Sequence, residues 1–211
     1  MKKAQVVPIH KKNSILDKGN YRPVSVLPTI SKIYERAINV QLSEHFKNLF
    51  NPFLAAFRAG YGCQSTLLKV IEDWKKALEE NKYIGAILMD LSKAFDCLPH
   101  DLLLLKLHEY GLAPKALTLI KSYLENRLQC VKLGQITSTY EHITKGVPQG
   151  SILGPVLFNI FINDIFLFVN NSTIYNYADD NTLSSSDRSP EVVKSNLLQD
   201  SEKLIIKVVQ R

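Results

Sequence analysis

The chain has few cysteines, and their placement excludes several classes of protein. Only Cys63, Cys97 and Cys130 occur among 211 residues, an odd number without Cys-x-x-Cys spacing. This pattern argues against a disulfide framework and a zinc ribbon, and it is typical of a reducing compartment. Histidine is sparse too: the five histidines form no metal-ligand spacing and belong to no Ser-His-Asp arrangement with a glycine elbow. The glycines form no Walker loop.

Long uninterrupted apolar runs are also missing. The longest apolar stretch, 152–170, is broken by Gly154, Pro155, Asn159, Asn163 and Asp164, so we expect no membrane span there. The basic N-terminus is followed by no apolar segment of signal-peptide length. We therefore expect an intracellular protein, nuclear or cytoplasmic, that has no membrane partner.

What is present indicates a folded domain with a slightly basic surface. Hydrophobic residues make up 45% of the chain and charged residues 22%, close to the average of globular proteins. A chain of 211 residues can bury a core as one large domain or as two packed subdomains. The net charge of +6 fits a polyanionic partner, although the early lysines are also typical of a solvated surface.

Apolar periodicity predicts an α+β fold. An apolar run over 83–90 predicts a central strand covered on at least one face. Hairpin patterns occupy 129–143 around Gly134-Gln135, and two further strands are expected within 173–183. Helices are expected over about 29–48, from an N-cap at Ser65, over about 101–110 and 114–126, from the 146–150 loop through Asn163, and from Ser189 onward.

Three aspartates are candidates for metal chemistry. Asp90 ends the predicted 83–90 strand, where an unpaired carboxylate needs a cation or solvent. Asp179 and Asp180 stand in the turn between two short strands and cannot neutralise each other. Because neighbouring strand residues point to opposite faces, we expect Asp179 to face Asp90 and Asp180 to be peripheral. Such oxygen ligands suit Mg²⁺, whereas either motif alone is also typical of an ordinary cap or exposed turn.

The order of several motifs identifies a family. The chain resembles the reverse transcriptases of non-long-terminal-repeat retrotransposons, of the LINE and jockey kind, over nearly its whole length. The resemblance is carried by NYRPVSVLP at 20–28, FRAG at 57–60, MDLSKAFD at 89–96, GVPQGSILGP at 146–155 with Leu157-Phe158 and Asn163-Asp164, and YADD at 177–180.

The resemblance implies an RNA-directed DNA polymerase that joins deoxynucleotides to a primer 3′-hydroxyl. Two Mg²⁺ ions, with Mn²⁺ as an alternative, would be held by Asp90, Asp179 and Asp180 with the backbone carbonyl of Leu91. Phe95, beside Ala94, would be the steric gate against a ribose 2′-hydroxyl, although an ordinary core aromatic is the alternative. An RNA polymerase typically has a polar residue at this position.

Other site residues follow from the same likeness. Gln149 would contact the incoming nucleotide, and Arg22 would clamp its triphosphate with help from Lys11 or Lys12. Gly150 and Tyr177 would contact the template or primer strand. Asp96, although within a matching segment, is expected to cap a turn. The expected partners are an RNA template, a DNA primer or RNA–DNA hybrid, and deoxynucleoside triphosphates.

The implied architecture is the fingers and palm of a right-hand polymerase, in which helices back a small, mostly antiparallel palm sheet. Residues of about 1–82 would be mainly fingers, and about 83–211 mainly palm with some fingers elements. The family's later tryptophan, lysine strand and thumb have no counterpart before Arg211, so a truncated and weakly active retrotransposon copy is expected. The alternative is an inactive remnant that still binds nucleic acid.

Overall fold

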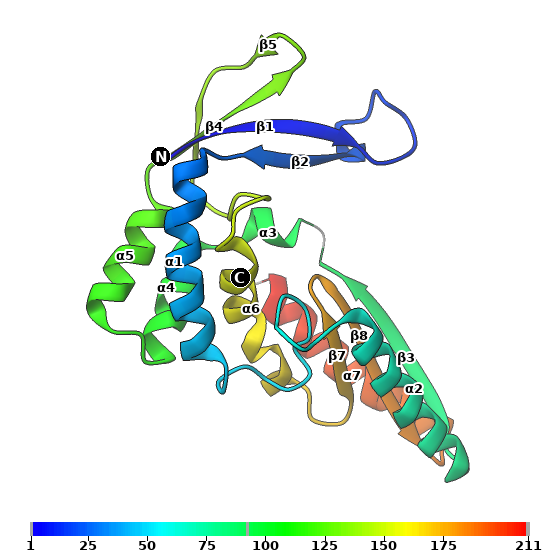
Figure 1. Ribbon diagram of the computed structural model, residues 1–211. Coiled ribbons are helices and arrows are strands. Elements are labelled where there is room, and N and C mark those ends of the chain that lie inside the picture. The colour runs from blue at the N-terminus through cyan, green and yellow to red at the C-terminus, as the bar shows by residue number, and fades with distance from the viewer. Residues whose placement is uncertain (1, 92, 210–211) are drawn as a thin grey trace. The chain divides into compact units, whose positions relative to one another are not determined.

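The computed structural model describes residues 2–91 and 93–209 (Figure 1). Its contacts divide the chain into two compact units that alternate along the sequence. Unit 1 contains Met1–Asn48 and Lys93–Ile160, and unit 2 contains Leu49–Ser92 and Phe161–Arg211. Because contacts alone define these units, the division into fingers over about 1–82 and palm over about 83–211 stays a prediction.

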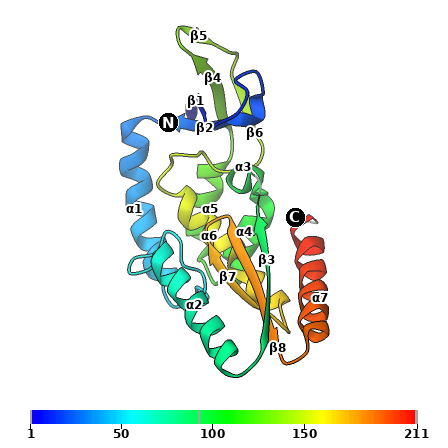
Figure 2. The ribbon, with the colours of Figure 1, turned by 90° about the vertical axis from the view of Figure 1, so that its right-hand side faces the viewer.

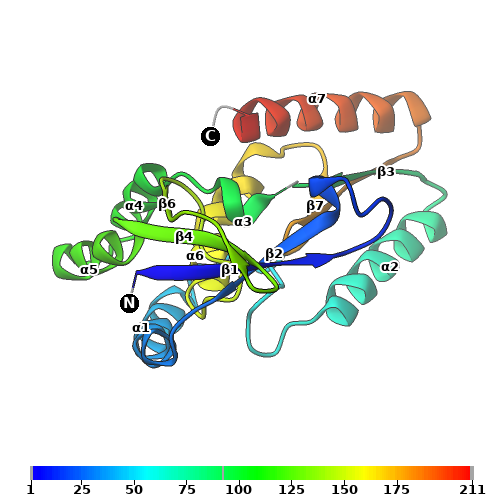
Figure 3. The same ribbon diagram turned by 90° about the horizontal axis from the view of Figure 1, so that it is seen from above.

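Unit 1 contains a five-stranded sheet in which β1 (Lys3–His10) lies between β2 and β4 (Figure 3). The partner β2 (Tyr21–Val26) is antiparallel to β1, and β4 (Arg127–Leu133) is parallel to it. The short 3-10 helix η1 (Lys18–Asn20) lies between β1 and β2. Strands β5 (Ile136–Thr137) and β6 (Glu141–Ile143) both pair antiparallel with β4, which confirms the hairpin expected around Gly134-Gln135.

The described α-helices of unit 1 were expected from the sequence, except for one short helix at 94–97. They are α1 (Thr29–Phe46), α3 (Ala94–Cys97), α4 (His100–Glu109), α5 (Pro114–Leu124) and α6 (Gly154–Ile162), whose last two residues belong to unit 2. Leu103, Leu107 and Leu124 are fully buried, and Phe46 packs edge-on against Tyr110 with 5.5 Å between ring centroids. These contacts form the core of the helical part of unit 1.

Unit 2 is built on a three-stranded antiparallel sheet in the order β3 (Tyr83–Asp90), β8 (Asp180–Asp187), β7 (Thr173–Tyr177). Its helices α2 (Cys63–Glu79) and α7 (Pro190–Val209) cover opposite faces of this sheet (Figure 2), and the 3-10 helix η2 (Asn163–Phe168) precedes β7. Indole Nε1 of Trp74 on α2 donates to the Ser184 hydroxyl at 2.9 Å. On the other face, a Cβ at Gly85 would lie 2.7 Å from Val193 and Leu197 of α7, so only glycine allows this close packing.

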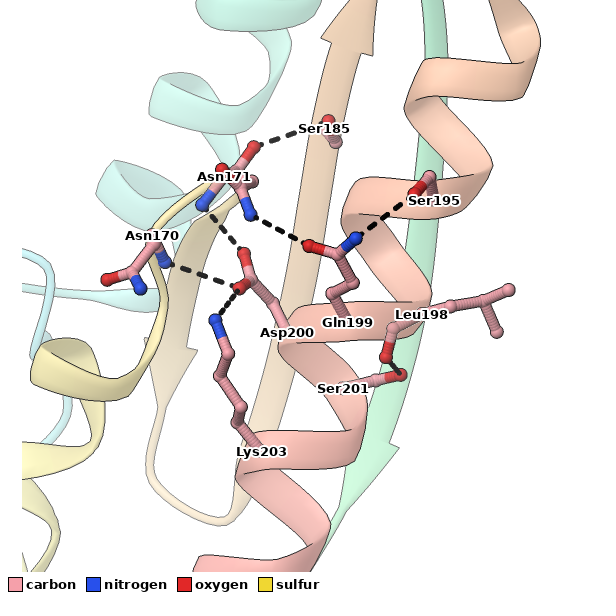
Figure 4. A network of polar contacts seen from close by, with 9 residues as sticks. All are labelled: Asn170, Asn171, Ser185, Ser195, Leu198, Gln199, Asp200, Ser201 and Lys203. Carbon is pink, nitrogen blue, oxygen red and sulfur yellow. Dashed lines mark hydrogen bonds and ion pairs between the residues drawn. The ribbon is translucent and has the colours of Figure 1, made fainter.

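Helix α7 is also held at its middle by a buried carboxylate (Figure 4). The Asp200 side chain is fully buried and accepts the backbone N–H groups of Asn170 and Asn171 at 3.4 and 2.8 Å. Lys203 forms an ion pair with it at 3.3 Å. Burial disfavours the charged form, but these donors outweigh it and hold the pKa of Asp200 below its ordinary value.

Two details of the predicted elements are wrong. Within residues 2–91 and 93–209, β3 pairs with β8 alone and is an edge strand, not a central one. An apolar run does not report the number of neighbouring strands, and this one does not report full burial either, since no residue of β3 is buried and Leu88 is 80% exposed. Helix α2 begins at Cys63, and Ser65 is its third residue, where its hydroxyl accepts the N–H of Gly62 at 2.9 Å.

No helix in the described part of the chain has both the length and the apolar character that a membrane span requires.

Candidate active site

The YADD motif forms a two-residue turn at the end of the unit 2 sheet. Strand β7 ends at Tyr177, which is the register partner of Asp180, the first residue of β8. Ala178 therefore occupies the first turn position, and its φ of 57° lies in the left-handed region. This conformation disfavours a residue with a Cβ by about 1–2 kcal/mol, so the surrounding contacts must hold the turn in place.

The strand register places two of the three candidate carboxylates opposite each other. Asp90, the last residue of β3, is paired with Asp180, and directly opposed residues carry their side chains on the same face. Asp179 lies in the turn, and its carbonyl accepts the N–H of Leu91 at 3.2 Å. The expectation that Asp179 faces Asp90 rested on strand alternation across both residues, but the strand begins at Asp180, so the register opposes Asp180 and not Asp179 to Asp90. The ranking of the three as ligands stays a prediction.

The electrostatics of this sheet end favour a bound cation. Asp90 and Asp180 are exposed and Asp179 is half-buried. Like charges directly opposite each other on neighbouring strands are unfavourable. In the described part of the chain, no ion pair involves these three carboxylates. The described residues also contain no group of three or more His, Cys, Asp or Glu that could hold a metal ion by itself. This donor set fits Mg²⁺, which retains waters and binds one or two carboxylates plus substrate phosphates.

Gln149 lies in a loop of unit 1 that two contacts hold. Its Nε2 donates to both carboxylate oxygens of Asp96, at 2.9 and 3.1 Å. Its carbonyl accepts the N–H of Ser25 on β2 at 2.7 Å. The expected turn cap by Asp96 stays a prediction, and the structure adds a contact that was not expected: its carboxylate orients a side chain 53 residues away. Sequence reasoning missed this role because the two residues meet only in the tertiary structure.

Gly150 follows Gln149 and has a φ of 112°, which favours glycine. A Cβ at this position would lie 2.9 Å from the carbonyl oxygen of Ser25, so the close approach that requires glycine is to β2. The predicted template contact of Gly150 remains a prediction.

Phe95 lies on α3 beside Ala94, and both are half-buried. Its ring stacks on Phe158 with 4.5 Å between centroids and 28° between planes. Phe158 is 2% exposed, so one face of the Phe95 ring rests on a fixed core side chain. The stacking supports a rigid ring, which a steric gate requires, and it is equally compatible with a core role.

The three predicted triphosphate contacts lie on the β1–β2 hairpin. Arg22 on β2 is exposed and is the register partner of Ile9 on β1. Lys11 follows β1, and its N–H donates to the carbonyl of Asn20 at 2.8 Å, which continues the hairpin ladder. Strand alternation therefore places Lys11 on the same face as Arg22, with the exposed Lys12 one residue further.

A buried glutamate on α1 is a residue that sequence reasoning missed. Glu35 is 1% exposed, and its Oε2 accepts the N–H groups of Ile152 and Leu153 at 2.7 and 3.2 Å, directly before α6. Burial and then the Glu35 charge raise the pKa of Tyr123 to about 12. The available signal was its spacing, since Glu35 lies on the buried stripe of α1 with Ser31, Ile38, Leu42 and Phe46.

Comparisons with known proteins agree with these motifs. The family described as "Reverse transcriptase (RNA-dependent DNA polymerase)" matches residues 9–208. The RNA-directed DNA polymerase from mobile element jockey of Drosophila funebris is 38% identical over 152 residues, covering 71% of this chain and 16% of that protein. The probable RNA-directed DNA polymerase from transposon X-element of Drosophila melanogaster is 36% identical over 149 residues, covering 70% and 16%. The chain thus spans about one sixth of the length of these relatives.

Solved structures show the same fold. A telomerase from Candida albicans, in complex with a fragment of telomeric RNA, has a TM-score of 0.68 at 15% identity, over 99% of this chain and 39% of that one. The apo telomerase from Candida tropicalis, truncated from its C-terminal domain, has a TM-score of 0.65 at 12% identity, over 97% and 46%. This likeness confirms an α+β fold of the fingers and palm type. On the family match and these relatives, the chain belongs to the reverse transcriptases, of the kind found in jockey-like LINE retrotransposons.

Proposed function

We propose that this chain carries the polymerase centre of an RNA-directed DNA polymerase, which extends a DNA primer along an RNA template. The observation that carries the proposal is the end of the unit 2 sheet, where Asp90 and Asp180 are opposed and Asp179 occupies the adjoining turn. No described ion pair neutralises them. Family membership supplies the reaction class.

The residues that would hold Mg²⁺, or Mn²⁺ in its place, are Asp90, Asp179 and Asp180 with the carbonyl of Leu91. A pair of such ions, when bound, would supply activation of the primer 3′-hydroxyl and stabilisation of the leaving pyrophosphate. The carboxylates contribute negative charge at an exposed position, so cations and the substrate phosphates they carry are drawn to this sheet end.

The remaining residues bind and select the nucleotide. Arg22 offers a planar fork of donors for a triphosphate, and Lys11, on the same hairpin face, or Lys12 adds a point charge. Gln149, oriented by Asp96, contacts the incoming nucleotide. Phe95, supported by Phe158 and beside Ala94, excludes a ribose 2′-hydroxyl.

Tyr177 and Gly150 are proposed to contact the template or primer strand. The partners in this proposal are an RNA template, a DNA primer or RNA–DNA hybrid, and deoxynucleoside triphosphates. The location is intracellular, in the compartment where these partners meet.

Primer extension on an RNA template with Mg²⁺ tests the proposal. Wild-type chain is expected to extend the primer with deoxynucleotides, and Asp179→Asn and Asp180→Asn are expected to reduce extension to background. Asp101→Asn, which removes an exposed carboxylate on α4, is the matched control and should retain wild-type activity.

Two other outcomes would contradict the proposal. Template–primer binding without any extension would assign the chain to non-catalytic nucleic-acid binding. Equal incorporation of ribonucleotides, unchanged by Phe95→Ala, would indicate an RNA polymerase.

A further inference from the structure

Two asparagines lie buried beneath the YADD turn. Asn176 on β7 and Asn181 on β8 are register partners, and they are 0% and 2% exposed. They are separated from the turn residues Ala178 and Asp179 by Tyr177 and Asp180, which form the last pair of the ladder. Buried amide side chains need hydrogen-bond partners, so the positions of these partners show which segments the two asparagines hold.

Their donors are directed to the turn. Nδ2 of Asn176 donates to the carbonyl of Ala178 at 2.8 Å and to Oδ1 of Asn181 at 3.0 Å. Nδ2 of Asn181 donates to the carbonyl of Asp179 at 3.1 Å. The pair therefore bonds to both carbonyls of the two-residue turn, and we name Asn176 and Asn181 the turn brace.

The brace is itself fixed from outside the hairpin. The carbonyl of Asn176 accepts the N–H of Ala55 at 3.4 Å. The segment before Ala55 is held by Arg58, whose Nη1 donates to the carbonyls of Asn51 and Leu54 at 2.9 and 2.8 Å. The Arg58 guanidinium also lies 4.1 Å from the ring centroid of Tyr61. The FRAG motif at 57–60 thus supplies a side chain, Arg58, that holds the segment bonded to β7 at Asn176.

The turn brace is also connected to the end of β3 through a shared acceptor. The Asp179 carbonyl that accepts from Asn181 accepts the N–H of Leu91 as well, at 3.2 Å. Leu91 directly follows Asp90, so one carbonyl links the turn, the brace and the end of the strand that carries the third carboxylate. A displacement of this carbonyl would move Asp179 and the end of β3 together.

The composition of the pair favours this role over simple packing. Two apolar side chains of similar shape would fill the same buried space without requiring partners. Moreover, Oδ1 of Asn176 has no hydrogen-bond partner within the described residues, so the pair is not the arrangement that packing alone would favour. What the amides add is a fixed position for the turn.

We propose that Asn176 and Asn181 are positioning residues, which hold the Ala178–Asp179 turn rigid and thereby set Asp179 and Asp180 relative to Asp90 for cation binding. The part that concerns cation binding rests on the proposed function. The brace itself does not, since the hydrogen bonds exist whether or not an ion is bound.

The test compares a double variant, Asn176→Val with Asn181→Val, with the wild-type chain. Valine suits a strand and fills the buried space, but it donates nothing to the turn. Ser184→Ala is the matched control, since Ser184 is buried on the same strand and loses hydrogen bonds to Trp74 and Gly85, away from the turn. Asn181→Ser, which keeps a donor, is the second variant in case the double variant does not fold.

Two measurements are made on folded protein. The first is hydrogen exchange of the Leu91 amide, which we expect to be at least about tenfold faster in the double variant because its acceptor is no longer held. The second is Mn²⁺ affinity by electron paramagnetic resonance, with Asp180→Asn as the ligand-loss reference. We expect a loss of about 10- to 100-fold in the double variant and a smaller loss in Asn181→Ser. Ser184→Ala should match wild type in both.

The outcomes separate the brace from the proposed function. Wild-type Leu91 exchange in the double variant, or in Asn181→Ser where the double variant does not fold, would overturn the brace. Faster exchange with wild-type Mn²⁺ affinity would overturn the positioning of the carboxylates. If the wild-type chain bound no Mn²⁺, the proposed function and the cation-binding part would fail, while Leu91 exchange would still decide the brace.

Discussion

Glu35 binds the segment that directly follows the Gln149 loop, so a substitution at Glu35 removes hydrogen bonds of that segment and leaves its own residues unchanged. The Glu35 carboxylate accepts two backbone N–H groups, those of Ile152 and Leu153, from a position that is 1% exposed. These donors directly precede the N-terminus of α6, where a negative charge is favourable. Glu35→Ala removes both acceptors, whereas Glu35→Gln keeps one acceptor oxygen and removes the charge.

The size of the effect follows from these contacts. A hydrogen bond to a charged group contributes about 1.5–3 kcal/mol, and a buried donor without a partner has a comparable cost. We therefore expect Glu35→Ala to lower the free energy of unfolding by about 3–5 kcal/mol. Glu35→Gln retains a weaker acceptor, so we expect a loss of about 1–2 kcal/mol.

Urea unfolding followed by circular dichroism measures both variants. Glu44→Gln is the control on the same helix, because Glu44 is exposed and its 3.8 Å pair with Lys47 is a surface ion pair. Such a pair contributes at most about 1 kcal/mol, so this variant should stay close to wild type. Equal free energies of unfolding for Glu35→Ala and Glu44→Gln would refute the role assigned to the buried carboxylate.

Three further changes have expected results. Because the pKa of Asp200 is lowered in the folded chain, its stabilisation is present above the unfolded pKa and is lost as pH falls through the folded value. Asp200→Asn should therefore flatten the fall in unfolding free energy below about pH 4, and an unchanged acid limb would contradict this. Ala178→Gly removes the strain of the left-handed φ, and the larger conformational entropy of glycine in the unfolded chain offsets part of the gain, so the free energy of unfolding should rise by about 0–1 kcal/mol. A lower free energy of unfolding in urea would contradict a strained turn. Phe95→Ala should admit ribonucleotides in primer extension, and continued rejection of ribonucleotides would exclude the gate. The same change removes the stacking on Phe158 and some apolar burial, so it should lower the free energy of unfolding by about 1–3 kcal/mol.

Local patterns were sufficient where the chain's own neighbours decide the structure. The helix at Thr29–Phe46 and the one at Pro114–Leu124 were predicted from apolar spacing, and their observed ends lie within two residues of the expected ones. The strands on either side of Asp179 were predicted in the same way. Side-chain period and turn composition depend on residues a few positions apart, so a single sequence contains them.

Strand position and buried polar contacts were not accessible in this way. The sequence did not indicate that β3 is an edge strand, because its continuous apolar run is typical of a central strand although none of its residues is buried. The contact of Asp96 with Gln149 spans 53 residues, and that of Glu35 with Ile152 spans 117. No local pattern encodes which distant donor meets a given carboxylate.

The sequence alone determined the family, through motifs whose residue types the chemistry requires, and it determined which three aspartates are candidates for metal binding. Only the tertiary structure decided that Asp90 is opposed by Asp180 and that Asp179 lies in the turn. It also decided that Asn176 and Asn181 bond to that turn. The reason is that the pairing of β3 with β8 joins residues from 90 apart, at Asp90 and Asp180, to 104 apart, at Tyr83 and Asp187. A register shifted by one residue would move every side chain of the strand to the other face.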